Sequence, residues 1–265
     1  MTGVVDFHTH AFPDALADRA IGVLQEQGGI KAHRDGRISS LLASMDDAGI
    51  ERSVVCSIAT KESQFDSIFA WSKKIRSERI EPFPSFHPRD PHYARRIERI
   101  RGDGFAGIKF HPYYQDFTID DETFFPLYES CARSHLLVVF HTGFDFAFPF
   151  VDRAGPGRVA RIARKFPEMR IVTTHMGGWK QWEEVERVLL GGAVFMEISF
   201  SLEFVERDRA RRILLGHPPD RILFGTDSPW TDQAETMERL RALVPGEERL
   251  KKILRENALR LLAHD

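Results

Sequence analysis

The stretch VVDFHTH, residues Val4–His10, is a short apolar run that ends in two histidines. Its length and composition are typical of a buried strand. Side chains two residues apart on a strand point to the same face, so His8 and His10 can reach one cation together. Asp6 shares this parity, and a role behind a metal ligand or a structural hydrogen-bonding role would suit it equally. On its own, an HxH pattern is a weak signal.

Four later stretches repeat this arrangement, in which a polar side chain ends an apolar run. They are GIKFHP with Lys109 and His111, VVFHTG with His141, VTTHMGG with His175 and LFGTDSPW with Asp227. Each polar residue, taken alone, could be a hydrogen-bonded residue at a strand end. Together they indicate ligands gathered at one rim, because the carboxyl ends of parallel barrel strands meet there. Imidazole and carboxylate groups suit zinc, and also iron, manganese or nickel.

Eight apolar runs predict the fold class. They are Val4–His10, Ser53–Ala59, Ile80–Pro88, Phe105–Pro112, Leu136–Gly143, Arg170–Gly177, Ala193–Phe200 and Arg221–Pro229. The runs are continuous rather than alternating, as in parallel strands covered on both faces, and helical patterns lie between them. We therefore expect an α/β chain that forms one (β/α)8 barrel of the TIM type. An open doubly wound sheet is the alternative, weakened because no GxGxxG motif follows the first run.

The domain organisation is simple. No Pro/Gly/Ser-rich linker divides residues 1–265, so a single domain is predicted. The interval after the first strand is the longest, and residues 11–37 are expected to form an insertion at the rim. We interpret this insertion as a lid or a wall of the substrate site. A helix over roughly Glu247–Ala263 is expected to cap the barrel.

Composition narrows the class of partner. The chain is 42% hydrophobic and 29% charged, with a formal net charge of −2. This near-neutral balance gives no strong positive potential that would attract nucleic acid or an anionic membrane. We therefore expect a small-molecule substrate and neither of those partners. A homodimer is compatible with the sequence. Two cysteines, Cys56 and Cys131, are expected to be buried thiols, and a cytoplasmic location is predicted.

The combined motifs resemble a known family. The HTH motif, His141, His175 and the aspartate of GTDSPW resemble the amidohydrolase superfamily. The chain length and the segments FPD, MDDAGIERSVV and ILRENALRLL resemble its amidohydrolase-2 branch, which includes aminocarboxymuconate-semialdehyde decarboxylase and related lactonases. The resemblance implies one divalent metal, with zinc the first expectation, held by His8, His10, His141 and Asp227. It also implies that His175 hydrogen-bonds the metal's water or the substrate.

The expected reaction is hydrolysis of a small lactone, amide or ester. A metal with an open position lowers the pKa of its bound water towards about 7. Asp227 can accept that water's proton, and His175 can orient the nucleophile or stabilise the developing anion. Nonoxidative decarboxylation of a small cyclic or aromatic carboxylate is the alternative reaction. A barrel that binds a metal or ligand without catalysis is the third interpretation.

Lys109 is the ambiguous residue of the set. It could be a carbamate bridging two metals, a cation for a substrate carboxylate or carbonyl, or a buried ion-pair partner. We prefer the second role, because the resembled branch generally uses one metal, and we expect His111 to bind substrate beside it. His87, Glu197 and Trp230 are weaker candidates for the site. The remaining histidines are expected at the surface: His33, His92, His135, His217 and His264.

Overall fold

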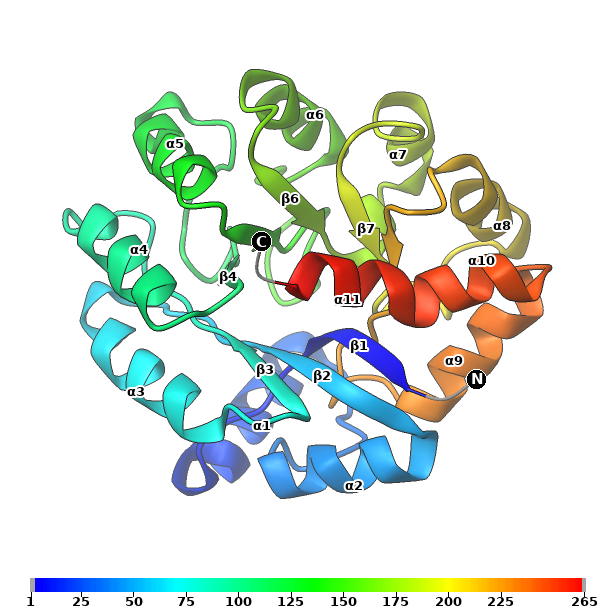
Figure 1. The fold of residues 1–265 in the computed structure, drawn as a ribbon, viewed down its shortest axis with the longest axis horizontal. Coiled ribbons are helices and arrows are strands. Elements are labelled where there is room, and N and C mark those ends of the chain that lie inside the picture. The colour runs from blue at the N-terminus through cyan, green and yellow to red at the C-terminus, as the bar shows by residue number, and fades with distance from the viewer. Residues whose placement is uncertain (1–2, 264–265) are drawn as a thin grey trace.

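All eight expected runs form parallel strands that follow one another around a barrel in chain order (Figure 1). A computed structural model describes residues 3–263, so His264 lies outside the described residues. The strands are β1 (Val4–Thr9), β2 (Ile50–Cys56), β3 (Ile80–Phe83), β4 (Gly107–Phe110), β5 (Leu137–Phe140), β6 (Arg170–Thr173), β7 (Phe195–Glu197) and β8 (Ile222–Leu223). The (β/α)8 fold class is therefore confirmed.

The strands are hydrogen-bonded as two arcs, β1 to β3 and β4 to β8, which meet at two seams. Between β3 and β4, the Lys109 N–H donates to the carbonyl oxygen of Pro84 at 3.2 Å. Proline has no N–H for a ladder, so pairing at this seam is sparse. Between β8 and β1, the Phe7 N–H donates to the Phe224 carbonyl at 2.8 Å, and Thr9 bridges Ser228. These contacts close the ring.

Helices pack around the strands and at the ends of the barrel (Figure 1). They are α1 (Asp14–Gly28), α2 (Ile38–Ala48), α3 (Phe65–Ile75), α4 (Tyr93–Gly102), α5 (Phe125–Arg133), α6 (Pro156–Lys165), α7 (Trp182–Val188), α8 (Arg207–Gly216), α9 (Gln233–Leu243), α10 (Glu247–Lys251) and α11 (Asn257–Leu262). Short turns η1 (Glu62–Gln64), η2 (Glu122–Phe124) and η3 (His175–Gly177) join them, and a π-helical segment, η4 (Lys252–Glu256), links α10 to α11. Gly29 and Gly49 end α1 and α2 in left-handed conformations, which glycine adopts without steric cost.

The C-terminal helices close one end of the barrel. In Figure 1, α10 and α11 cross the end that faces the viewer. Leu261 and Leu262 pack with Phe7, Leu137 and other side chains of the barrel interior, and all of them are buried. This packing removes apolar surface from water, which is the main source of stability in such a core. The predicted capping helix therefore shields the end opposite to the strands' carboxyl termini.

The region between β1 and β2 contains two helices. The second, α2, is the crossover expected between neighbouring parallel strands. The first, α1, lies within the predicted insertion, residues 11–37. Cys56 and Cys131 are buried free thiols. Over residues 3–263, no helix has both the length and the hydropathy that a membrane span requires.

Candidate metal centre and its cavity

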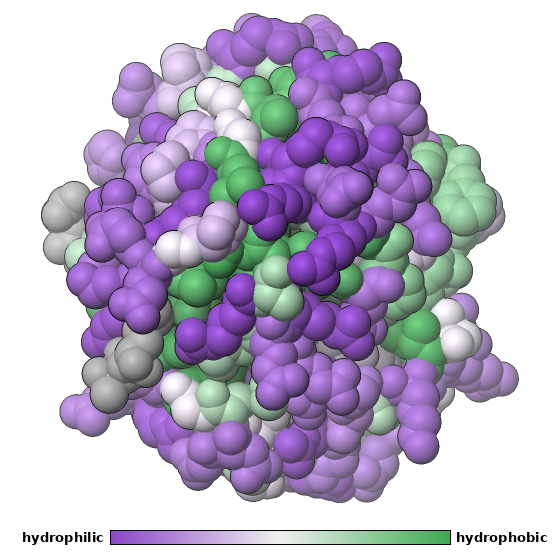
Figure 2. All heavy atoms as spheres, turned by 90° about the vertical axis from the view of Figure 1, so that its right-hand side faces the viewer, coloured by the Kyte–Doolittle hydropathy of each residue, from purple (hydrophilic) through white to green (hydrophobic). Residues whose placement is uncertain are grey.

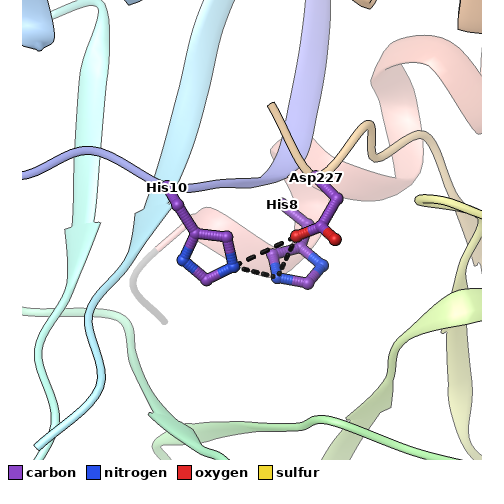
Figure 3. Close-up of side chains that lie close together, drawn as sticks. All are labelled: His8, His10 and Asp227. Atoms are coloured by element: carbon purple, nitrogen blue, oxygen red, sulfur yellow. Dashed lines mark hydrogen bonds and ion pairs between the residues drawn. The ribbon is translucent and has the colours of Figure 1, made fainter. Parts of the chain in front are cut away.

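Three side chains from the two ends of the chain meet at the rim of the barrel. His8 and His10 come from the end of β1, and Asp227 from the segment after β8 (Figure 3). His8 Nε2 lies 3.1 Å from His10 Nε2, and Asp227 Oδ1 lies 3.4 Å from the first nitrogen and 3.1 Å from the second. No dashed line reaches the other carboxylate oxygen of Asp227 (Figure 3). The three ligand atoms thus face one another.

Hydrogen bonds on the far sides of the rings indicate what these atoms can bind. His10 Nδ1 lies 2.8 Å from the carbonyl oxygen of Cys56, which can only accept, so Nδ1 carries the proton of the neutral ring. His8 Nδ1 lies 3.0 Å from Glu197 Oε1. Burial, and then the nearby Lys109 charge, hold the pKa of His8 well below its usual range. Two imidazole lone pairs and a carboxylate oxygen therefore converge, and this donor set suits a divalent metal.

Glu197 supports this group from the end of β7. Its Oε1 accepts hydrogen bonds from the backbone N–H of His175 at 3.0 Å and from the Ser199 hydroxyl at 2.8 Å, besides its contact with His8 Nδ1. Burial raises the pKa of Glu197 to about 8. A carboxylate behind a metal-binding histidine fixes the orientation and the tautomer of the ring. Glu197 is in position for that role towards His8.

Asp6 contacts the backbone near the metal-type ligands rather than their side chains, and its Oδ1 accepts a hydrogen bond from the His8 N–H at 3.2 Å. The pairing of β1 with β2 is irregular between Asp6 and Thr9. The Asp6 carboxylate accepts hydrogen bonds from Thr226, through both its N–H and its hydroxyl, and from the Gln233 side chain at 2.7 Å. Burial raises the pKa of Asp6 to about 6. Of its two predicted roles, the structure supports structural hydrogen bonding, which ties β1 to the segment that carries Asp227.

His141 and His175 form a second pair of facing nitrogens. His175 Nδ1 lies 3.0 Å from the carbonyl oxygen of Ser199, and His141 Nε2 lies 3.1 Å from that of Phe144. Their remaining nitrogens, His175 Nε2 and His141 Nδ1, are 3.1 Å apart. Because both carbonyls are acceptors, two neutral rings would face each other with lone pairs, an arrangement that could bind a cation between them. Burial lowers the pKa of both histidines.

Lys109 lies between the two groups of histidines. It is fully buried, and its Nζ is 3.2 Å from His8 Nε2. Burial lowers the pKa of this amine. Among the described residues, no carboxylate lies within 4.0 Å of Nζ, so the ion-pair role has no partner there. The amine is thus available to a substrate or to carbamylation.

Asp145 is a buried residue of the site that the sequence analysis missed. Its Oδ2 lies 3.3 Å from His111 Nε2 and 3.9 Å from His141 Nε2. The imidazole rings of His111 and His141 stack with their centroids 4.1 Å apart. His111, His141 and Asp145 therefore form another group with ligand atoms within 4.8 Å of one another. The position of Asp145, four residues after His141 in the segment after β5, was the signal available in the sequence. His141 groups with these residues rather than with His8, His10 and Asp227.

These groups form the floor of a cavity of about 410 Å³ at the mouth of the barrel. Its walls are mainly apolar. They come from residues 11–30, from α3 and from the segments after β5 to β8, and include Phe12, Leu16, Leu24, Ile30, Ile68, Trp71, Phe144, Phe146, Trp179, Phe200 and Trp230. Of the weaker candidates, Trp230 lines this cavity. His87 is half-buried and does not line the cavity.

Of the remaining histidines that the structure describes, all but one lie at the surface, as expected. His33, His92 and His135 are exposed. His217 is buried, and its Nε2 donates to the carbonyl oxygen of Val194 at 2.9 Å. The prediction of a surface position for His217 is therefore wrong. Its place at the end of α8, packed against the segment before β7, cannot be read from helical spacing alone.

Comparisons with known proteins give the family. A family model described as Amidohydrolase (Amidohydro_2) matches residues 5–263. The chain belongs to this amidohydrolase family. Among curated proteins, none matches it significantly.

Solved structures share the fold at low sequence identity. An uncharacterised TIM-barrel protein from Bordetella bronchiseptica superposes with a TM-score of 0.76 and 19% identity, over 98% of each chain. A 5-carboxyvanillate decarboxylase from Sphingomonas paucimobilis gives 0.74 and 16%, over 99% of each chain. A dihydroxybenzoic acid decarboxylase from Polaromonas, solved with manganese and 2-nitroresorcinol, gives 0.73 and 15%, over 99% of this chain and 97% of that one. At these identities the likeness establishes the barrel.

Proposed function

We propose that this member of the amidohydrolase family is a metal-dependent, nonoxidative decarboxylase of a small aromatic carboxylate. The observation that carries the proposal is a floor of metal-type ligands beneath aromatic and aliphatic walls. Such a cavity suits a planar apolar body with one polar end. The named decarboxylases of the same fold support this reaction. The proposal therefore places decarboxylation ahead of hydrolysis, the reverse of the order expected from the sequence.

The proposed metal ligands are His8, His10 and Asp227, because their donor atoms already converge. Bound there, a divalent metal would hold the substrate's carboxylate end and withdraw electron density from it. Manganese is the first metal to test, since it accompanies the Polaromonas enzyme, and zinc remains the prediction from the donor set. The resemblance adds His141 to the ligands. Its Nδ1, which faces His175, is the nitrogen that would bind the metal.

The chain's own residues supply the proton and the positioning. In the reaction, the bond between ring and carboxylate breaks, its electron pair stays on the ring carbon, CO2 leaves, and that carbon takes up a proton. We assign the proton transfer to Asp227 Oδ2, the carboxylate oxygen for which no contact with His8 or His10 is drawn (Figure 3). We assign to Lys109 the binding of the carboxylate or a neighbouring hydroxyl. We assign to His175, whose Nδ1 lies 3.0 Å from the Ser199 carbonyl oxygen, the orientation of the substrate or a bound water.

Hydrolysis of a lactone, amide or ester is the second candidate. It is favoured by the same free oxygen of Asp227, which could accept a proton from water instead of delivering one to carbon. Residues 11–37 remain a proposed lid or wall, supported by the cavity-lining side chains of α1. A cytoplasmic location and a small-molecule substrate belong to the same proposal.

Isotope incorporation separates the two reactions. The protein, freed of metal and reloaded with manganese or zinc, is incubated with hydroxybenzoates and with lactones in D2O and in H2(18)O. We expect CO2 release and one deuterium on the ring carbon that bore the carboxylate. Asp227→Asn should lower this rate at least 100-fold. Asp220→Asn, a matched change at an exposed aspartate before β8, should leave it unchanged.

Two outcomes would contradict the proposal. Opening of a lactone with uptake of one solvent oxygen, without CO2 from any carboxylate, would support the hydrolase. A fully loaded protein that transforms neither class would support the interpretation as a binding barrel without catalysis.

A further inference from the structure

The cavity above the metal-type ligands has a marked division of charge. Its titratable side chains are those of the floor, from the ends of the strands and the segments that follow them. Among the lining residues that the structure describes, Lys109 is the only lysine, and no arginine is present. A buried anion needs a paired charge or several hydrogen bonds to offset its lost hydration. The floor can bind one carboxylate in this way. The walls contain no cation that could pair with a second carboxylate.

The upper walls are built from two helices that present apolar faces to the cavity. On α3, Ile68 and Trp71 are three residues apart, so both point to one side of the helix. On α1, Leu16 and Leu24 lie two turns apart and also line the cavity. Gln64 and Ser67, beside the α3 pair, add neutral polar groups that can bind a hydroxyl or an ether. These walls suit an uncharged body.

The rim is apolar as well. Leu16 and Phe146 line the cavity and remain 55% and 37% exposed. In the side view of Figure 2, most of the surface is hydrophilic, and hydrophobic atoms project at the edge that corresponds to the back of Figure 1. An apolar ligand could therefore lose water gradually as it enters the cavity.

The volume of the cavity exceeds what one ring requires. An apolar cavity of about 150 Å³ holds a benzene molecule, so the volume of 410 Å³ is roughly two to three times that of a single-ring site. A metal ion and the substrate's carboxylate would occupy the floor. The remaining space, between α1 and α3, can accept about one more ring.

From these observations we infer that the substrate is an aromatic monocarboxylate with an uncharged extension about as large as a second ring. This inference rests on the proposed function for the carboxylate end and on the walls for the remainder. It sets the chain apart from an enzyme for aromatic dicarboxylates, because a second carboxylate would meet Ile68, Trp71 and Leu24 without a counter-ion.

Three probes that share an ortho-hydroxyl carboxylate test the inference: 1-hydroxy-2-naphthoate, 2-hydroxybenzoate and 4-hydroxyisophthalate. Binding to the manganese-loaded protein is followed by quenching of tryptophan fluorescence, since Trp71, Trp179 and Trp230 line the cavity. CO2 release is measured separately. We expect the naphthoate to bind at least tenfold more tightly than the single-ring monocarboxylate and at least 100-fold more tightly than the dicarboxylate, with kcat/KM in the same order.

A charge placed in the wall should change this order. Ile68→Arg should improve binding of the dicarboxylate relative to the naphthoate at least tenfold. Ala70→Arg adds the same charge to the exposed side of α3, away from the cavity, and should leave the preference unchanged. If both variants shifted the preference equally, a general charge effect would replace the wall argument.

The outcomes distinguish this inference from the proposed function. Preferential naphthoate binding without CO2 from any probe would uphold the inferred ligand class and refute the decarboxylase. Equal binding and turnover of the three probes, or a preference for the dicarboxylate, would overturn the inference and leave the decarboxylase standing.

Discussion

Glu197→Gln tests how the metal-type ligands are organised, because one oxygen of Glu197 faces three hydrogen-bond partners. Glu197 Oε1 lies 3.0 Å from His8 Nδ1, 3.0 Å from the His175 N–H and 2.8 Å from the Ser199 hydroxyl. An amide has one acceptor oxygen, and its NH2 group would meet the backbone N–H of Ser199, which now donates to Oε2 at 2.6 Å. The variant should therefore hold His8 less well and lose the negative charge behind it.

The size of the effect follows from this position. Removing a partner behind a metal ligand weakens metal binding by roughly 10–100-fold, which corresponds to about 1.4–2.7 kcal/mol. Stability of the metal-free protein should also fall, by about 1–3 kcal/mol, because the amide NH2 would face the Ser199 N–H and leave a buried donor without an acceptor. The orienting role of Glu197 therefore predicts a loss of metal affinity in addition to this loss of stability.

Titration calorimetry with manganese, or competition with a chelator for zinc, measures the affinity, and urea unfolding in chelator measures stability. Glu81→Gln is the matched control, since Glu81 is a partly buried glutamate on β3 that lines no part of the cavity. An affinity of Glu197→Gln within threefold of the native value would refute the argument that Glu197 orients His8. A loss of stability without metal, accompanied by unchanged metal affinity, would mean that Glu197 is mainly a structural residue.

Three further predictions concern other parts of the barrel. Lys109→Met should raise KM or lower kcat while elemental analysis still finds one metal per chain, and loss of a second equivalent would instead indicate a carbamate between two metals. Leu261→Ala should lower the free energy of unfolding by about 2–5 kcal/mol, because Leu261 is 5% exposed within the barrel interior; Leu215→Ala, at an exposed position, should change it by less than about 0.5 kcal/mol. Burial lowers the pKa of His217, so its neutral form is favoured in the folded protein, and stability should fall as the pH drops below the unfolded value of about 6.5. His217→Gln should reduce the difference between urea midpoints at pH 7.5 and 5.5, measured in chelator, and an unchanged difference would refute this assignment.

The order of elements and the strand-end chemistry could be predicted from the sequence. Eight continuous apolar runs separated by helical patterns are enough for a parallel barrel, because both periodicities are local and each connection must return across the sheet. Because the carboxyl ends of parallel barrel strands meet at one rim, the sequence also predicted that His8, His10 and Asp227 lie together, although residues 10 and 227 are far apart in the chain. The capping helix was also visible, since its apolar spacing is a property of its own residues.

The side-chain arrangement at the rim depended on tertiary structure. Spacing places Asp6, His8 and His10 on one face, yet the irregular pairing of β1 takes Asp6 to Thr226 and Gln233. Sequence also cannot indicate which nitrogen of a histidine meets a carbonyl, so the facing nitrogens of His141 and His175 emerged only in the fold. Asp145 lies on an irregular segment without periodicity, and its contact with His111 joins the ends of two strands.

What the sequence determined by itself, then, is the barrel and the groups at the strand ends of its mouth, Asp145 excepted, because these follow from local patterns and one topological rule. What only the tertiary structure decided is which of those groups face one another, how Glu197 and the backbone carbonyls set their tautomers, and that the walls above them carry no second cation. Such features depend on rotamers and on contacts between segments distant in sequence, which hydrophobic periodicity does not encode.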